Sequence, residues 1–523
     1  MFRFFILSSI CWIVSLSAQA QKDPLALKYS QSITPESLSE YLHVLASDSL
    51  EGREAGTAGQ KKAADYLKSK FNYFGLKAIV PNGKDSSYFQ QFELVNKSWQ
   101  DVYLKVGKSK KVFLQDFYAY GDVEIAEEEK LPIVFGGYGI EAQNYSDYKN
   151  LDVNGKGVVL FMGEPFVDGK SLITGTTSSS DWANDWRKKT AKAKQKGAKA
   201  VFIVVGKTQE DFETRLAKLK PHLVEPMVGF THKQSENGAF FVPLALAAEM
   251  LKTKEEKLTL SLNKLSTKTG KPSFHSARVL IKAEMSKFAF QTENVLGFLE
   301  GKSRKDEVIV ITAHYDHLGR KGDQIFYGAD DDGSGTAAVI ALAKAFAQAA
   351  AEGNQPERSI LFMPVTAEEK GLMGSEYYTD KPVIPLANTV ANLNIDMIGR
   401  VDEAHTHPNY VYLIGSDKLS TTLHKVSSDA SNLYIPDIEL DYTFNRKDDP
   451  NRFYYRSDHY NFAKNNIPVI FYFNGVHEDY HKATDTVDKI DFEKVSLITK
   501  LIFFTAWELA NLDKAIEVDV KGE

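Results

Sequence analysis

The chain has 523 residues, of which 43% are hydrophobic and 25% are charged, an ordinary composition for folded domains with apolar cores. A chain of this length favours two or three domains over a single core. The 63 Lys and Arg residues against 69 Asp and Glu residues give a net charge of −6, which argues against a nucleic acid as the main partner.

Residues 1–20 predict a secretory signal peptide. Arg3 precedes an apolar run from Phe4 to Leu16, and an A-x-A cleavage signal ends at Ala20. The run is too short to span a bilayer as a helix, so we expect a periplasmic or extracellular protein with no membrane anchor after cleavage. The only cysteine, Cys11, lies in this segment, so the mature protein would have neither disulfides nor Cys-ligated zinc.

Two helices are predicted before the first β segment. Thr34 and Pro35 are typical of an N-cap followed by proline at the first helical position, and this helix would end near Leu45. A polar loop over 47–60 separates it from a second helix over 61–74, and a β segment follows over 88–114. Residues 21–127 would form the N-terminal part of the main domain.

Residues 128–266 are predicted to form an inserted αβ domain. Apolar strands near 131–140 and 155–165 precede a Lys-rich helix over 186–197 and a further strand that begins at Ala200. No cluster of His, Asp and Glu with ligand spacing occurs in this region, so we expect an accessory domain.

Strands and helices alternate over residues 267–515, the main part of the larger domain. The strands are expected over 294–299, 308–312, 359–366, 392–397 and 468–473, and the helices over 335–351 and 491–512. This alternation predicts an α/β fold with a mostly parallel mixed sheet and helices on both faces.

Potential metal ligands follow several of these strands, at the sheet edge where open α/β folds bind their ligands. They are His314 and Asp331, Glu368 and Glu369, Asp396, and finally His477, Glu478, Asp479 and His481. Imidazoles and carboxylates make a hard N and O set that suits Zn²⁺ and, less well, Mn²⁺ or Co²⁺. A single zinc uses three protein ligands, whereas two metals with a shared carboxylate can use five, so the count favours a two-metal site. The acidic turn 330–332 alone would fit a calcium loop or a solvated turn equally well.

Several motifs in this order resemble the secreted dizinc aminopeptidase family, which is related to glutamate carboxypeptidase and the transferrin receptor. The motifs are LASDSLEGREAGTAG, TAHYDHLG, GADDDGSGTAAV, TAEEKGLMGSEYY, NIDMIGR and YHKATDTVDKID. The resemblance covers Thr292 to Leu512 and the N-terminal helices. IVFGGYGI and DYKNLDVNGKGVV resemble a protease-associated domain, which such enzymes often carry as an insert.

The resemblance implies two Zn²⁺ ions with a bridging carboxylate. His314, Asp331 and Asp396 would hold one zinc, and Asp331, Glu369 and His481 the other. A cis peptide bond is expected after Asp331.

The resemblance also implies roles for residues that do not bind metal. Glu368 would be the general acid and base, and Asp316 would accept the second hydrogen bond of the His314 ring and fix its tautomer. Glu376, Arg400, Ser457, Asp458, His459 and Asp485 also fall in these motifs. Helix surface, capping or packing behind the ligands is the default interpretation for these six residues, and Asp458 and His459 are the best candidates among them to line the pocket.

The expected activity is hydrolysis of N-terminal residues from peptides by metal-activated water, with a glutamate base. A carboxypeptidase or dipeptidase is the alternative, in which a pocket arginine such as Arg446, Arg452 or Arg456 would hold the substrate carboxylate. A one-zinc glutaminyl cyclase is disfavoured because the ligands for a second metal are present. A non-catalytic binding protein would be expected to have lost ligands, and none is lost.

Overall fold

The computed structural model describes residues 21–521 except for 122, 232, 234–237, 267–273 and 275–276. The predicted signal peptide lies outside the described residues. The chain divides into two compact units, which are described separately: unit 1 consists of Met1–Phe92 and Gln291–Glu523, and unit 2 consists of Glu93–Phe290.

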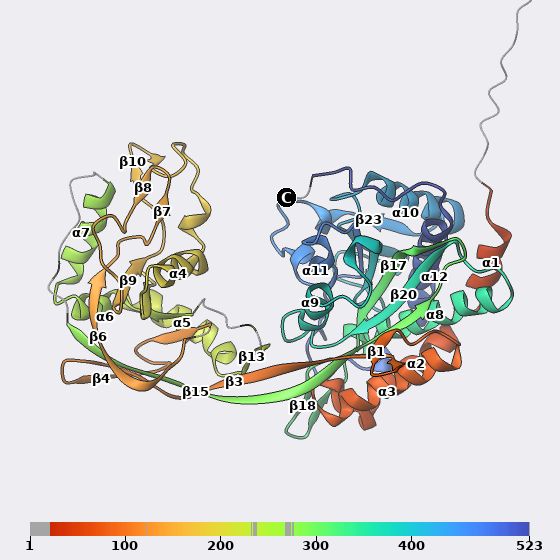
Figure 1. The fold of residues 1–523 in the computed structure, drawn as a ribbon, viewed down its shortest axis with the longest axis horizontal. Coiled ribbons are helices and arrows are strands. Elements are labelled where there is room, and N and C mark those ends of the chain that lie inside the picture. Colours follow the sequence, from red (N-terminus) through yellow and green to blue (C-terminus); the bar gives the residue numbers. More distant parts are fainter. Residues whose placement is uncertain are drawn as a thin grey trace, which may run out of the picture. The chain divides into compact units, whose positions relative to one another are not determined.

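Unit 1 is built on a seven-stranded mixed sheet (Figure 1). The strands in spatial order are β16 (Gly297–Leu299), β20 (Arg358–Val365), β17 (Arg304–His314), β21 (Thr389–Ile395), β24 (Val469–Phe473), β22 (Tyr410–Ile414) and β23 (Glu439–Asp441). The central strands β20, β17, β21 and β24 are parallel, and antiparallel pairs occur only at β16 with β20 and at β22 with β24. The predicted mostly parallel mixed sheet is therefore confirmed.

Helices cover both faces of this sheet, as predicted. The larger core holds side chains from α1 (Pro24–Ser30), α2 (Pro35–Leu45), α3 (Ala58–Tyr73), α8 (Gly335–Ala351), α10 (Thr421–Tyr434) and α12 (Phe492–Asn511). On the opposite face a smaller core joins the strands to α9 (Met373–Asp380) and α11 (His459–Ala463). Among the described residues, Ala329–Ala351 is long and apolar enough to cross a membrane, but 78% of its most apolar window is buried, the pattern of a core helix.

Capping residues determine where the helices α2 and α3 begin. The Thr34 hydroxyl accepts a hydrogen bond from the Ser37 amide, so α2 begins at Pro35 as predicted. The second helix begins at Ala58, earlier than predicted, because Thr57 caps it through the amide of Gln60. Neither β22 nor α10 was predicted.

Unit 2 contains a nine-stranded mixed sheet with helices on both faces. The strands include β6 (Ile125–Phe135), β9 (Gly157–Phe161), β12 (Ala200–Val204) and β14 (Ala239–Val242), and the helices are α4 (Trp186–Gln195), α5 (Gln209–Leu223), α6 (Leu244–Met250) and α7 (Glu255–Ser266). The unit begins earlier and ends later than the predicted insert, 128–266. The reason is that two long strands, β3 (Phe89–Val106) and β15 (Arg278–Val295), run from unit 1 into this sheet.

Candidate metal centre

The central strands of unit 1 place the predicted ligands at one edge of the sheet. Because β17, β20, β21 and β24 are parallel, the segments after their carboxyl ends meet there. His314 ends β17, Asp331 lies in the turn Ala329–Ser334 before α8, Glu368 and Glu369 follow β20, Asp396 follows β21, and His481 lies in the loop after β24.

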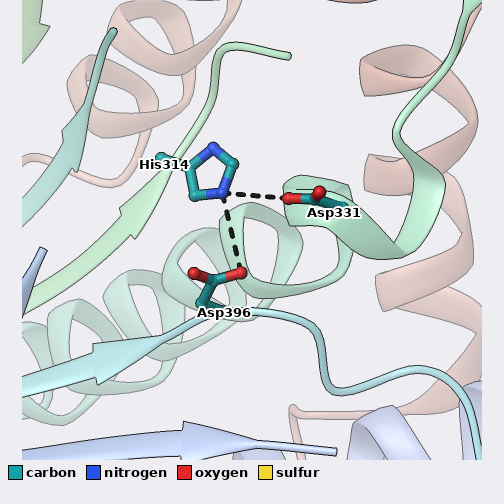
Figure 2. Close-up of side chains that lie close together, drawn as sticks. All are labelled: His314, Asp331 and Asp396. Atoms are coloured by element: carbon teal, nitrogen blue, oxygen red, sulfur yellow. Dashed lines mark ion pairs between the residues drawn. The ribbon is translucent and has the colours of Figure 1, made fainter. Parts of the chain in front are cut away.

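Asp331 lies at the centre of the group and faces a different partner with each oxygen. Its Oδ1 is 3.1 Å from His314 Nε2, which is 3.6 Å from Asp396 Oδ1 (Figure 2). Its Oδ2 is 3.1 Å from His481 Nε2, which is 3.3 Å from Glu369 Oε2. One carboxylate therefore joins two groups, each of one imidazole and one further carboxylate.

These distances fit metal coordination. In a tetrahedral zinc site with bonds of about 2.0–2.1 Å, neighbouring ligand atoms lie about 3.3 Å apart. Asp331 Oδ2 and Glu369 Oε1 are buried, and although histidine nitrogens lie 3.1 Å and 2.8 Å from them, neither oxygen has a well-aligned hydrogen bond among the described residues, which is costly for a carboxylate unless a cation is bound. The donor set therefore fits two metal ions that share Asp331.

A histidine that was not predicted joins the second group. His317 is fully buried, and its Nδ1 lies 2.8 Å from Glu369 Oε1 and 3.9 Å from Asp331 Oδ2. His317, Asp331 and Glu369 offer ligand atoms within 4.8 Å of one another. The available signal was a second histidine three residues after His314 in the same motif.

The hydrogen bond that fixes His314 differs from the predicted one. His314 Nδ1 lies 3.0 Å from the main-chain oxygen of Asp316 and 3.8 Å from its Oδ1. A carbonyl oxygen can only accept, so Nδ1 carries a proton, and Nε2 of the neutral ring would be free to bind a metal ion. The Asp316 carboxylate instead accepts the amide of Glu368 at 3.1 Å, and burial raises its pKa to about 6.

The turn that holds Asp331 is fixed by neighbouring carboxylates. Its peptide bond to Asp332 is cis, as the resemblance implies. Asp332 accepts the amides of His314, Gly335 and Met397, and Asp485 accepts the amides of Asp330 and Asp331. The orientation of Asp331 is therefore set by the surrounding chain.

Arg53 supports the same turn from the N-terminal segment. Its fully buried guanidinium donates to the main-chain oxygens of Leu45, Tyr315, Tyr327 and Gly328. Tyr315 follows His314, and Gly328 precedes the acidic turn, so one side chain joins both ligand-bearing segments. The Arg residue of the LEGREAG motif is thus a positioning residue for the candidate metal centre.

Replacing Arg53 with Met should lower both stability and zinc affinity. The change removes the donor for four buried carbonyl oxygens, and a loss of at least about 3 kcal/mol in the free energy of unfolding is expected. Arg358→Met is the matched control, since Arg358 is equally buried and donates to the carbonyls of Leu509, Leu512 and Lys514. The control should lose stability but bind zinc as the wild type does; equal zinc affinity in both variants would contradict the positioning role.

A cleft opens on the candidate ligands. Its lining includes His314, Asp331, Glu368, Asp396 and His481, together with Met397, Phe453, Arg456, Phe471, Phe473, Val476 and Tyr480. Asp458 and His459, the best candidates among the six motif residues to line the pocket, instead have the packing role expected by default: Asp458 accepts the Ser375 hydroxyl and His459 stacks on Phe471. One wall of the cleft is therefore apolar and largely aromatic.

This chain is similar in sequence to a known peptidase family and to curated aminopeptidases. Residues 294–506 match the model of peptidase family M28. A probable leucine aminopeptidase from Arthroderma otae is 29% identical over 235 residues, which are 44% of this chain and 61% of that protein. Aminopeptidase YwaD from Bacillus subtilis is 28% identical over 30% of this chain and 39% of its own length. The matched region thus covers less than two thirds of the length of each of these relatives.

A solved structure extends the likeness to the fold. The aminopeptidase from Aneurinibacillus sp. strain AM-1 aligns over 95% of this chain and 98% of its own, with a TM-score of 0.54 and 19% identity.

Proposed function

We propose that this chain, which belongs to peptidase family M28 through residues 294–506, is a dizinc aminopeptidase that removes N-terminal residues from peptides. The observation that carries the proposal is the placement of Asp331 between two histidine–carboxylate groups at the floor of a cleft.

The ligand assignment follows the distances around Asp331. His314 and Asp396 would share one zinc with Asp331, and Glu369 and His481 would share the other. When bound, such ions polarise a carbonyl group and lower the pKa of a bound water towards neutrality.

Glu368 is the group best placed to move the proton. Its Oε2 lies 3.9 Å from His314 Nε2 and its side chain lines the cleft, although it belongs to neither of the two groups around Asp331. Burial raises the pKa of Glu368 well above its usual value, which allows the carboxyl to hold a proton between steps. Glu368 would take the proton of the attacking water and return it to the leaving amine.

The apolar wall favours a bulky apolar residue at the peptide N-terminus. Phe453, Phe471 and Phe473 lie together with Met397 in one cluster beside the candidate ligands. A leucine or phenylalanine side chain would bury its surface there, at about 25 cal/mol per Å².

A carboxypeptidase or dipeptidase is the second candidate, and one residue favours it. Of the three arginines considered from the sequence, Arg456 lines the cleft. Arg446 is paired with Asp448 and exposed, and Arg452 stacks on Tyr455. Arg456 could therefore meet a substrate carboxylate.

An anilide panel separates the two activities. We expect dye release from leucyl and phenylalanyl anilides, little from glutamyl anilide, and none from N-acetyl-leucyl anilide or N-blocked dipeptides. Arg456→Leu should change the leucyl anilide rate less than threefold, as should the control Arg452→Leu. Cleavage of N-blocked dipeptides that Arg456→Leu alone abolishes would establish the second candidate instead.

Two further parts of the proposal concern the rest of the chain. The apolar run of residues 4–16 supports secretion to the periplasm or the cell exterior. Unit 2, with its own sheet and cores, supports an accessory domain of the protease-associated type.

A further inference from the structure

A second cluster of histidines and carboxylates lies at one edge of the sheet of unit 1, on β23 and on the segment before β22. β23 presents Glu439 and Asp441 on one face, because side chains two residues apart in a strand point the same way. The parallel register places Tyr410 of β22 opposite Glu439 and Tyr412 opposite Asp441. His405 and His407 lie on the segment that leads into β22.

His405 is held in one orientation by its neighbours. Its ring stacks on Tyr410 with centroids 3.4 Å apart and an interplanar angle of 6°. Its Nδ1 lies 2.8 Å from Asp402 Oδ1, and Asp402 is fixed in turn by the Tyr412 hydroxyl at 2.7 Å. The side chains of His405 and Asp402 are each only 8% exposed, so this arrangement is rigid before any ligand binds.

The orientation leaves the other ring nitrogen facing carboxylates. A carboxylate accepts the Nδ1 proton, so the neutral ring has its lone pair on Nε2, which lies 3.4 Å from Asp441 Oδ2. A lone pair directed at a carboxylate oxygen is repulsive unless a cation lies between them. His405, Glu439 and Asp441 offer ligand atoms within 4.8 Å of one another, and His407 Nε2 lies 3.4 Å from Glu439 Oε2.

We propose that His405, Asp441 and Glu439 form a binding site for a divalent transition metal, with Zn²⁺ as the best match. The 3.4 Å separation of His405 Nε2 and Asp441 Oδ2 is close to the distance of about 3.3 Å between neighbouring ligands of tetrahedral zinc. The Asp402–His405 pair supplies the carboxylate–histidine arrangement typical of zinc ligands. Glu439 and His407, whose side chains are 54% and 49% exposed, leave the site open to solvent.

A metal at this site would stabilise the loop that carries His481. The Tyr410 hydroxyl donates to the main-chain oxygen of Asn474 at 2.6 Å, where β24 ends. At Gly475, a Cβ would lie 2.4 Å from Asp402 Oδ2, so the loop backbone lies directly against the carboxylate that orients His405. The site is therefore structural, and its existence does not depend on the proposed function.

The test is a difference in zinc content. Wild type and the double variant Glu439→Gln/Asp441→Asn are dialysed to equilibrium against buffered free Zn²⁺, and bound zinc is measured by elemental analysis. At a free Zn²⁺ concentration that fills the cleft equally in both proteins, the wild type should hold one ion more per chain than the double variant. The control Asp323→Asn/Asp429→Asn, which removes two carboxylates that belong to no histidine cluster, should match the wild type.

Equal zinc content in the wild type and the double variant would overturn the proposal, because the cluster would then hold a proton in place of a metal. Glu439→Gln alone changes a half-exposed side chain and should leave the chain folded. It should raise the Kd of the additional ion at least about tenfold, because loss of a residue that only hydrogen-bonds to a metal ligand already weakens metal binding by about 10–100-fold. An unchanged Kd for this ion would also contradict the assignment.

Discussion

Replacing Glu368 with Gln is expected to lower kcat by about 10² to 10⁴, the range for loss of a general acid and base. The amide keeps nearly the same size but cannot take the proton of the attacking water. Because Glu368 is outside the two groups around Asp331, zinc content should stay at the wild-type level and KM should change little. Steady-state kinetics on leucyl anilide, with elemental analysis of the same sample, measures both quantities.

The neighbouring Glu369 provides the matched comparison. Glu369→Gln removes the same charge from the same segment but takes an oxygen from the group with His481 and His317. Its defect should come from weaker zinc binding and should be partly relieved by excess Zn²⁺. A Glu368→Gln variant that has lost zinc beside a Glu369→Gln variant that has kept it would reverse the two roles.

Replacing Asp331 with Asn should affect both metal positions at once. Each Asp331 oxygen is 3.1 Å from a different histidine, and the amide would present one oxygen and one NH₂ group in their place. We expect zinc affinity at both positions to fall by at least about 100-fold, because loss of a ligand should exceed the effect of losing a residue that only hydrogen-bonds to a ligand. Leucyl anilide hydrolysis should fall below detection, and excess Zn²⁺ should not restore it.

Asp330→Asn is the control from the same turn. Asp330 accepts the Gly399 amide and the Ser334 hydroxyl and lies near His477, so its carboxylate supports the backbone and points away from the ligand group. The control should lower the melting temperature while zinc content stays unchanged. If Asp331→Asn kept full zinc content, the shared carboxylate would lie elsewhere.

The parts of the fold that followed from the sequence are those that local chemistry determines. The helix α8 matches its predicted range because an apolar stretch rich in alanine begins directly after the glycine-containing turn. The strand that ends at His314 is buried and apolar on both faces over Val308–Ile311, as its sequence indicates, whereas the buried strand before Asp396 carries Asn392 and Asn394 on one face. Their parallel order then places the candidate ligands at one edge.

The features that were missed depend on contacts between distant segments. The sequence places Arg53 in a polar loop. The side chain is nevertheless fully buried, because it donates hydrogen bonds to four carbonyl oxygens from three separate segments. The hydrogen bond of His314 Nδ1 was expected to go to the Asp316 side chain. The backbone conformation places the Asp316 carbonyl oxygen closer to Nδ1 than the carboxylate, which the sequence does not show. Unit 2, Glu93–Phe290, extends beyond the predicted insert, 128–266, because parts of the long strands β3 and β15 belong to it.

The zinc content of active protein tests the two-metal account most directly. The measurement uses the Glu439→Gln/Asp441→Asn variant, so that the cluster around His405 contributes nothing to the count. Purified without chelator, this variant should carry close to two zinc ions per chain and hydrolyse leucyl anilide. Activity should disappear on chelation and return as two equivalents of Zn²⁺ are added. Full activity with a single stoichiometric ion would contradict the account.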